Sequence, residues 1–171
     1  MSVDTLTLSA WETRVAHFGN RMILYAPLYF SNYCVNDCLY CNFRVSNKML
    51  SRGRLDVSEV LAEARAIRNR GIRRITLVTG EMPWEKVGSD ILEVVDALHQ
   101  EDLFEYISGN FGALPDEAFS ALAKSGIDSY QIFQETYDLA TYTIMHPRGP
   151  KHDFAWRWNT PFRALRAGIP T

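Results

Sequence analysis

Apolar and polar residues alternate along the chain in a way that predicts short strands separated by amphipathic helices. Four apolar, β-branched or aromatic runs have strand length, at residues 23–30, 75–79, 106–108 and 129–133. Helical patterns with start and stop signals begin near residues 9, 56, 89, 115 and 160 and end near residues 19, 71, 100, 126 and 168. This order, a leading helix followed by four β/α units, predicts a parallel sheet covered by helices and therefore an α/β fold.

Capping signals place two of the predicted helix starts. Ser9 and Glu12 have the spacing of a capping box, so the first helix is expected to begin at Ser9 and to stop before Gly19. Asp56 has the same place ahead of the second helix. The spacing of the aromatic residues predicts that four of them pack in the core: Trp11, Phe18, Phe30 and Phe133.

Composition and charge exclude several classes of function. The chain has 171 residues, of which 47% are hydrophobic and 22% charged, values typical of one globular domain. Its 18 Lys and Arg against 20 Asp and Glu give a net charge of −2, unlike the strong positive charge of most duplex-DNA binders. No run reaches the about 18 to 20 apolar residues of a membrane span, and the N-terminus lacks a signal-peptide pattern. We therefore expect a single cytoplasmic domain over residues 1–171, with no nucleic-acid or membrane partner.

The cysteines of the chain, Cys34, Cys38 and Cys41, lie close together in the pattern C-x3-C-x2-C. An odd number of clustered cysteines is a poor disulfide framework and is typical of a metal site. Three thiolates on one loop can each bind one iron of a cubane cluster, which leaves the fourth iron open for an exogenous ligand. The alternative is a zinc ion held by the three thiolates and by one of the four histidines: His17, His99, His146 or His152.

The cysteine motif follows a predicted strand and has the aromatic residue Tyr40 directly before Cys41. In both respects it resembles the signature of the radical S-adenosylmethionine (SAM) enzymes. The resemblance implies a [4Fe-4S] cluster on Cys34, Cys38 and Cys41, with the amine and carboxylate of SAM on the open iron. It also implies an electron donor such as flavodoxin or ferredoxin, and reductive cleavage of SAM to a 5′-deoxyadenosyl radical. The implied fold is a partial (β/α) TIM-type barrel with about four parallel strands.

Longer stretches resemble the aromatic amino-acid lyases of that superfamily, above all the 2-iminoacetate synthases, the tyrosine lyases of thiamine thiazole biosynthesis. The matching stretches are residues 26–34, 46–48, 77–81, 86–88, 134–137, 153–157, 160–161 and 166–169. Residues 146–153 are more similar to the tyrosine lyase of hydrogenase maturation, and a tryptophan lyase is a more distant relative. The resemblance implies an amino-acid substrate, tyrosine, that is cleaved between Cα and Cβ to 2-iminoacetate and p-cresol.

The same resemblance assigns further residues to SAM binding. Gly80 and Glu81 match the element that receives the methionyl amine, Glu135 matches a contact to the ribose or the amine, and Tyr40 lies beside the adenine. Arg157 carries a planar guanidinium that suits the methionyl carboxylate. The competing interpretations are a solvated loop carboxylate for Glu81 and a surface arginine for Arg157.

Four β/α units are half of a complete (β/α)8 barrel, which takes about 250 residues. The fourth strand is then expected to expose an unpaired edge, so we expect a homo-oligomer or a partner chain to complete the barrel. Two classes of function remain open. One is an amino-acid lyase that works together with the later strands, and the other is a cluster- and SAM-binding half-barrel without turnover of its own.

Overall fold

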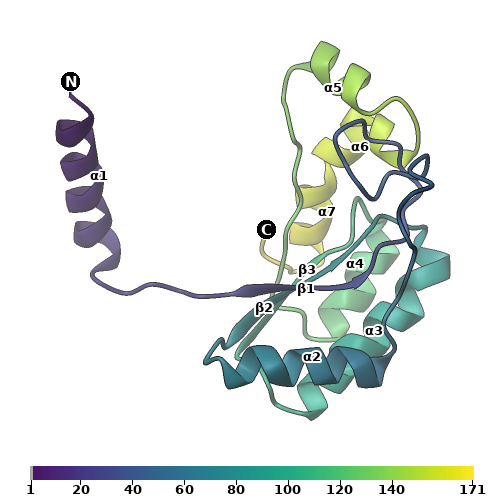
Figure 1. The fold of residues 1–171 in the computed structure, drawn as a ribbon, viewed down its shortest axis with the longest axis horizontal. Coiled ribbons are helices and arrows are strands. Elements are labelled where there is room, and N and C mark those ends of the chain that lie inside the picture. Colours follow the sequence, from purple (N-terminus) through teal and green to yellow (C-terminus); the bar gives the residue numbers. More distant parts are fainter. Residues whose placement is uncertain (1) are drawn as a thin grey trace.

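The computed structural model describes residues 2–171, and its elements alternate in the predicted order (Figure 1). The strands are β1 (Ala26–Ser31), β2 (Arg74–Thr79), β3 (Tyr106–Asn110) and β4 (Ser129–Tyr130). The α-helices are α1 (Val3–Phe18), α2 (Val57–Asn69), α3 (Trp84–Gln100), α4 (Asp116–Lys124), α5 (Leu139–Met145), α6 (Phe154–Trp158) and α7 (Thr160–Arg166). A short 3-10 helix, η1 (Pro150–His152), lies between α5 and α6.

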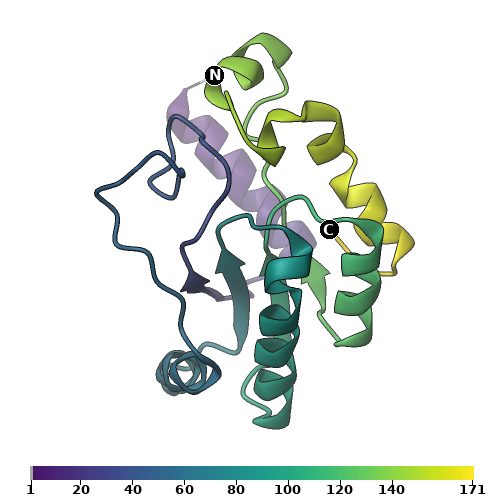
Figure 2. The ribbon, with the colours of Figure 1, turned by 90° about the vertical axis from the view of Figure 1, so that its right-hand side faces the viewer.

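The four strands form one parallel sheet in the order β1-β2-β3-β4. In its central row Leu28 pairs with Leu77, Leu77 with Gly109, and Gly109 with Tyr130. Helices α2, α3 and α4 cover one face of the sheet, as Figures 1 and 2 show. The predicted α/β class and the partial barrel with four parallel strands are therefore confirmed.

The core lies between the sheet and these helices. Ile75 and Leu77 of β2 point into it, and they meet apolar side chains such as Val95 of α3 and Phe119 of α4, all fully buried. The Phe119 ring packs edge-on against Tyr130, with 4.8 Å between the ring centroids. Since buried apolar area contributes about 25 cal/mol per Å², this face supplies the main stabilisation of the sheet.

Capping explains the bounds of two helices. Asp56 accepts from the backbone N–H of Glu59, and the Glu59 carboxylate accepts from the Asp56 N–H, each at 2.9 Å, so the predicted start of α2 is confirmed. Helix α3 begins at Trp84, five residues before the predicted start at 89. A Cβ on Gly88 would lie 2.6 Å from the Trp84 ring, so this glycine makes room for the ring inside the helix.

Helix α1 differs from its prediction at one end and in its packing. It begins at Val3 with Ser2 as the N-cap rather than Ser9, and it stops before Gly19 as predicted. No side chain of α1 is buried, and Trp11 and Phe18 are 55% and 71% exposed, so their predicted core positions are wrong. In Figure 1 the helix stands apart from the sheet, joined to β1 by an extended segment over residues 20–25.

The chain after α4 differs from the prediction in its elements. Strand β4 ends at Tyr130 instead of residue 133, and α5, η1 and α6 occupy a stretch for which no element was predicted. The outer edge of β4 is partly paired, because the Tyr130 N–H donates to the carbonyl of Pro170 at 2.8 Å. Among the helices of residues 2–171, none combines the length and apolar character needed to cross a membrane.

Candidate functional site

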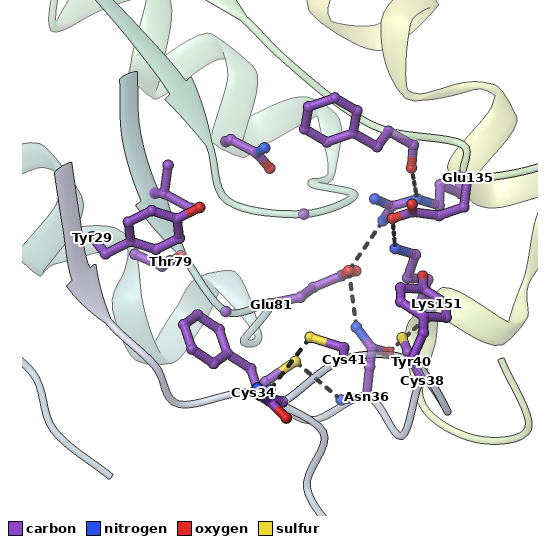
Figure 3. Close-up of a pocket in the computed structure, with 18 residues that line it drawn as sticks. Tyr29, Cys34, Asn36, Cys38, Tyr40, Cys41, Thr79, Glu81, Glu135 and Lys151 are labelled. Carbon is purple, nitrogen blue, oxygen red and sulfur yellow. Dashed lines mark hydrogen bonds and ion pairs between the residues drawn. The ribbon is translucent and has the colours of Figure 1, made fainter. Parts of the chain in front are cut away.

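A cavity of about 380 Å³ opens at the carboxyl ends of the strands, where α/β folds place their functional groups (Figure 3). Figure 2 shows the long loop after β1 and the region of α5 and α6 together at this end of the sheet. The cavity is lined by all three cysteines and by each of the other residues assigned to SAM binding: Tyr40, Gly80, Glu81, Glu135 and Arg157. The predicted site residues, distant in sequence, therefore meet in one place.

The cysteine loop (residues 34–41) follows β1 and has no regular secondary structure. Its three thiols are free, and burial raises the pKa of the Cys34 and Cys38 thiols. Backbone N–H groups donate to two of the sulfurs, Asn36 to Cys34 at 3.4 Å and Phe43 to Cys41 at 3.3 Å. Such N–H···S bonds favour a charged thiolate, the form that binds metal.

The donor set fits a cluster that takes one thiolate on each of three irons. The three thiols are placed around one cavity, and none of its described lining residues is a histidine. Within residues 2–171, no group of three or more His, Cys, Asp or Glu side chains converges as the ligand set of one metal ion.

Glu81 follows β2 and is 8% exposed, so the interpretation as a solvated loop carboxylate is wrong. It accepts from the Asn36 amide at 3.0 Å and from the Ala113 N–H at 3.2 Å, and its Oε2 lies 3.3 Å from Nη1 of Arg157. The turn that aims it needs glycine, because a Cβ on Gly80 would lie 2.3 Å from the Tyr33 carbonyl oxygen.

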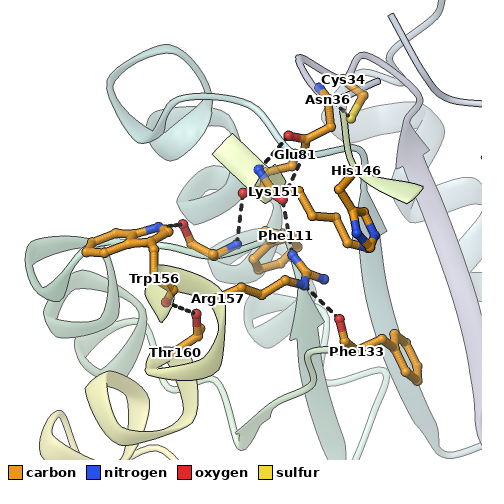
Figure 4. Close-up of polar contacts among 12 residues, drawn as sticks. Cys34, Asn36, Glu81, Phe111, Phe133, His146, Lys151, Trp156, Arg157 and Thr160 are labelled. Atoms are coloured by element: carbon orange, nitrogen blue, oxygen red, sulfur yellow. Dashed lines mark hydrogen bonds and ion pairs between the residues drawn. The ribbon is translucent and has the colours of Figure 1, made fainter. Parts of the chain in front are cut away.

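Arg157 comes from α6, and its burial excludes the surface interpretation. Its Nε donates to the Phe133 carbonyl at 2.7 Å, while Nη1 pairs with Glu81 (Figure 4). Side-chain exposures of 5% for Arg157 and 8% for Glu81 make this a buried ion pair. Sequence spacing did not reveal this pairing, because the two residues are 76 positions apart.

Glu135 lies beyond the end of β4, which stops at Tyr130, and it still reaches the cavity. Its backbone has φ +71°, the left-handed region that non-glycine residues rarely adopt. The Lys151 ammonium lies 2.6 Å from its carboxylate. Burial alone would raise the pKa of Glu135, but the hydrogen bond and charge of Lys151 outweigh burial and lower it.

Tyr40 lines the cavity on the side of Lys151, whose ammonium lies 5.6 Å from the centre of the Tyr40 ring. The Tyr40 hydroxyl bonds to Nε2 of His146 at 2.7 Å. Sequence reasoning gave no role to Asn36 or Lys151, and it named His146 only as one of four possible zinc ligands. Their only signal was that His146 and Lys151 lie in residues 146–153, the stretch with its own family resemblance.

The wall formed by the strands carries apolar and aromatic groups. Tyr29, Val78 and Asn110 are lateral neighbours on β1, β2 and β3, and all three line the cavity. In Figure 3 Tyr29 lies across the cavity from Glu135 and Lys151. Phe133, predicted to pack in the core, is 58% exposed and also lines the cavity. This wall can accommodate the ring of an organic molecule.

Comparison with known proteins identifies the family. The model of the radical SAM superfamily matches residues 28–171. The chain belongs to the radical SAM superfamily. Members of this superfamily use a [4Fe-4S] cluster and SAM, and the thiols, the buried carboxylate and the buried guanidinium of this radical SAM chain fit those groups.

Among curated proteins, the chain is 41% identical to 2-iminoacetate synthase of Escherichia coli K12 over 168 residues, which are 98% of this chain and 44% of that protein. It is 27% identical to 3-methylornithine synthase of Methanosarcina acetivorans over 92% of this chain and 44% of that protein.

The crystal structure of the FeFe-hydrogenase maturase HydG from Carboxydothermus hydrogenoformans is similar in fold. It has a TM-score of 0.92 and 43% identity over 96% of this chain and 38% of that one. This radical SAM chain thus spans less than half the length of each of these three relatives.

Proposed function

We propose that the chain binds a [4Fe-4S] cluster through Cys34, Cys38 and Cys41 and binds SAM at the iron that they leave open. The observation that carries this proposal is the meeting of three free thiols with the buried Glu81–Arg157 pair in one cavity. A zwitterionic methionyl group needs both an acceptor for its amine and a cation for its carboxylate. Glu81 and Arg157 can supply these two groups, and they line the same cavity as the three thiols.

SAM binding would exchange one ion pair for two. In the structure Glu81 and Arg157 form an ion pair with one another. We infer that the methionyl amine takes the acceptor position at Glu81 and the backbone of Gly80, while the carboxylate takes Arg157. Both buried charges then stay paired, which avoids the large penalty of an isolated buried charge. Glu135 is proposed to bind the ribose, and Tyr40 to lie beside the adenine.

When bound, the reduced cluster and SAM supply a 5′-deoxyadenosyl radical. The contribution of the chain is to orient the reactants and to exclude water. Asn36 and Ala113 hold the Glu81 carboxylate, and the Phe133 carbonyl holds the Arg157 guanidinium, so protein contacts fix the positions of both groups. An electron donor such as flavodoxin or ferredoxin would supply the electron.

For the substrate we propose an aromatic amino acid, tyrosine, cleaved between Cα and Cβ to 2-iminoacetate and p-cresol, as in thiamine thiazole biosynthesis. The support is the identity to 2-iminoacetate synthase and the wall of Tyr29, Val78 and Phe133, which suits an aromatic ring. A second candidate is a tyrosine lyase of hydrogenase maturation, favoured by residues 146–153 and by the similarity to HydG. A tryptophan lyase remains a further alternative.

We further propose that residues 1–171 form a single domain that needs additional strands for lyase activity. Four strands are half of a closed barrel. A second copy or a partner chain is expected to provide the rest. Without them the chain would bind the cluster and SAM but would not turn over tyrosine.

Anaerobic reconstitution with iron and sulfide, followed by EPR with and without SAM, tests the binding proposal. The expected result is about four irons per chain and a reduced-cluster spectrum that changes when SAM is added. Cys41→Ala is the matched control and is expected to lose the cluster. Stoichiometric zinc without iron uptake would refute the cluster, and a spectrum unchanged at saturating SAM would refute SAM binding.

Tyrosine lyase activity is tested separately by p-cresol formation in the presence of the later strands. SAM cleavage to 5′-deoxyadenosine with tyrosine left intact would reject tyrosine and leave the cluster and SAM assignments standing.

A further inference from the structure

The segment from Met145 to Lys151, the end of α5 and the start of η1, is hydrogen-bonded along the cysteine loop. The Met145 carbonyl accepts from the Leu39 N–H at 3.0 Å, and the Arg148 carbonyl accepts from the Asp37 N–H at 3.1 Å. These bonds join stretches more than 100 residues apart in sequence. We call residues 145–151 the clamp segment.

Two further contacts fix how closely the clamp segment approaches. The Lys151 N–H donates to the Asn36 side-chain oxygen at 2.7 Å, and Arg148 forms an ion pair with Asp37 at 2.6 Å. Gly149 has φ +91°, and a Cβ there would lie 2.5 Å from the Asn36 oxygen. Only glycine therefore allows this approach.

His146 is the most enclosed part of the segment, with no exposed surface. Its Nδ1 lies 2.8 Å from the Tyr142 carbonyl, which can only accept, so Nδ1 carries the proton. In the neutral ring Nε2 is then an acceptor, and the Tyr40 hydroxyl at 2.7 Å donates to it. Burial lowers the pKa of His146, which agrees with a neutral ring. This hydrogen bond therefore helps to fix the direction of the Tyr40 hydroxyl and ring.

Lys151 links the same loop to the other wall of the cavity. Its backbone holds Asn36, whose amide in turn donates to Glu81, and its ammonium pairs with Glu135 (Figure 4 shows Asn36, Glu81, His146 and Lys151). The clamp segment therefore contacts, directly or through one side chain, three of the residues proposed to bind SAM: Tyr40, Glu81 and Glu135.

We propose that the clamp segment sets the position of the SAM-binding side of the cysteine loop, with His146 as the positioning residue for Tyr40. The inference rests on the proposed binding of the cluster and SAM. The ring nitrogens of His146 hydrogen-bond to Tyr40 and Tyr142 and not to a cysteine, so its loss should weaken SAM binding and leave iron content unchanged. Groups that orient a ligating or binding residue in this way typically contribute about tenfold or more.

The test is a double-mutant cycle on the reconstituted chain, with SAM affinity taken from the EPR change and iron counted separately. We expect His146→Leu and Tyr40→Phe each to weaken SAM binding about tenfold at normal iron content. Both substitutions remove the same hydrogen bond. The double variant should therefore bind SAM about as tightly as the single variant with the lower SAM affinity. His146→Gln places an amide near the Nε2 position and should restore most of the affinity.

His99→Leu, a change at an exposed histidine of α3, is the matched control and should bind SAM like the wild type. Additive losses of SAM affinity in the double variant, or normal SAM affinity in His146→Leu, would refute the role of the clamp segment. They would leave the proposed binding of the cluster and SAM standing. Loss of iron in His146→Leu without rescue by Gln would also overturn the role of the clamp segment, because the role would then be merely structural. A wild-type chain that takes up no cluster would reject the proposed function itself.

Discussion

The helix-covered face of the sheet and the cavity at the carboxyl ends of its strands are stabilised in different ways. The face under α2, α3 and α4 is apolar, with residues such as Leu77 and Ile107 buried among helix side chains. At the carboxyl ends of the strands, by contrast, the buried groups include charged ones, Glu81 and Arg157 among them. The first region depends on volume and shape, whereas the second depends on specific partners, because a buried charge is tolerated only when it is paired.

This difference predicts that substitutions in the core and substitutions in the cavity affect different properties, the first stability and the second ligand binding. A core change should lower the free energy of unfolding and leave the affinity of the folded fraction for SAM intact. A cavity change should alter SAM binding, and its effect on stability should depend on whether it leaves a charge without its partner.

The largest expected effect is in the core, at Phe119. Phe119→Ala should lower the free energy of unfolding by about 3–5 kcal/mol, because a fully buried ring against Tyr130 is replaced by a cavity. Phe119→Leu, which keeps most of the volume, should have a clearly smaller effect. Denaturant unfolding of the cluster-free chain measures both. If the core variants lost SAM affinity in proportion to their loss of stability, the core and the cavity would not be independent as predicted.

The next effect is at the buried ion pair. Arg157→Met should destabilise the chain by about 3 kcal/mol, because Glu81 stays buried without its cation. Adding Glu81→Gln should recover part of that loss, since no charge then remains buried. In both variants SAM binding should be weakened or lost, so adding SAM should no longer change the EPR spectrum of the reduced cluster as it does in the wild type. Equal free energies of unfolding for Arg157→Met and for the double variant would show that an unpaired Glu81 carboxylate does not destabilise the chain.

A smaller effect is expected from acid at the Glu135–Lys151 pair. Because the folded-state pKa of Glu135 is lowered, its contribution is complete above the unfolded pKa and is lost as pH falls through the folded pKa. Glu135→Gln should therefore destabilise the chain at pH 7, and the difference from wild type should shrink as the pH falls through the lowered pKa of Glu135. The side chain is 34% exposed, so solvent screening keeps the effect below that of Arg157→Met. Urea midpoints at pH 7 and at acid pH measure it.

The smallest effect is expected on α1, which belongs neither to the core nor to the cavity. Trp11→Ala should change the free energy of unfolding by no more than about 0.5 kcal/mol, because the ring is 55% exposed on a helix that has no buried residue. Thermal unfolding of the two proteins side by side measures the difference. A loss comparable to that of Phe119→Ala would mean that α1 packs on the sheet in solution.

The sequence predicts well where local pattern and packing agree. Alternating apolar runs and the capping box at Asp56 locate the parallel sheet and α2 because each signal is confined to a few neighbouring residues. The motif spacing likewise locates the three thiols in one loop.

It predicts poorly where tertiary contacts decide. Lys151 and His146 are polar side chains buried by contacts with a loop more than 100 residues earlier, and nothing in their immediate neighbours indicates this. The strand predicted over residues 129–133 stops at Tyr130, and Glu135 beyond it has a left-handed backbone that no local pattern indicates. Trp11 and Phe18 have core-like spacing on a helix that meets no core, so periodicity alone could not show their exposure.

The direction of β1 has a practical consequence for attaching the chain to a surface. Helix α1 precedes the amino end of β1, while the cysteine loop follows its carboxyl end, so the two lie at opposite ends of the sheet (Figure 1). The extended stretch over residues 20–25 can span at most about 20 Å. A bead or electrode coupled through α1 would therefore hold the chain with its cavity facing the solution, open to both reactants and electron carriers.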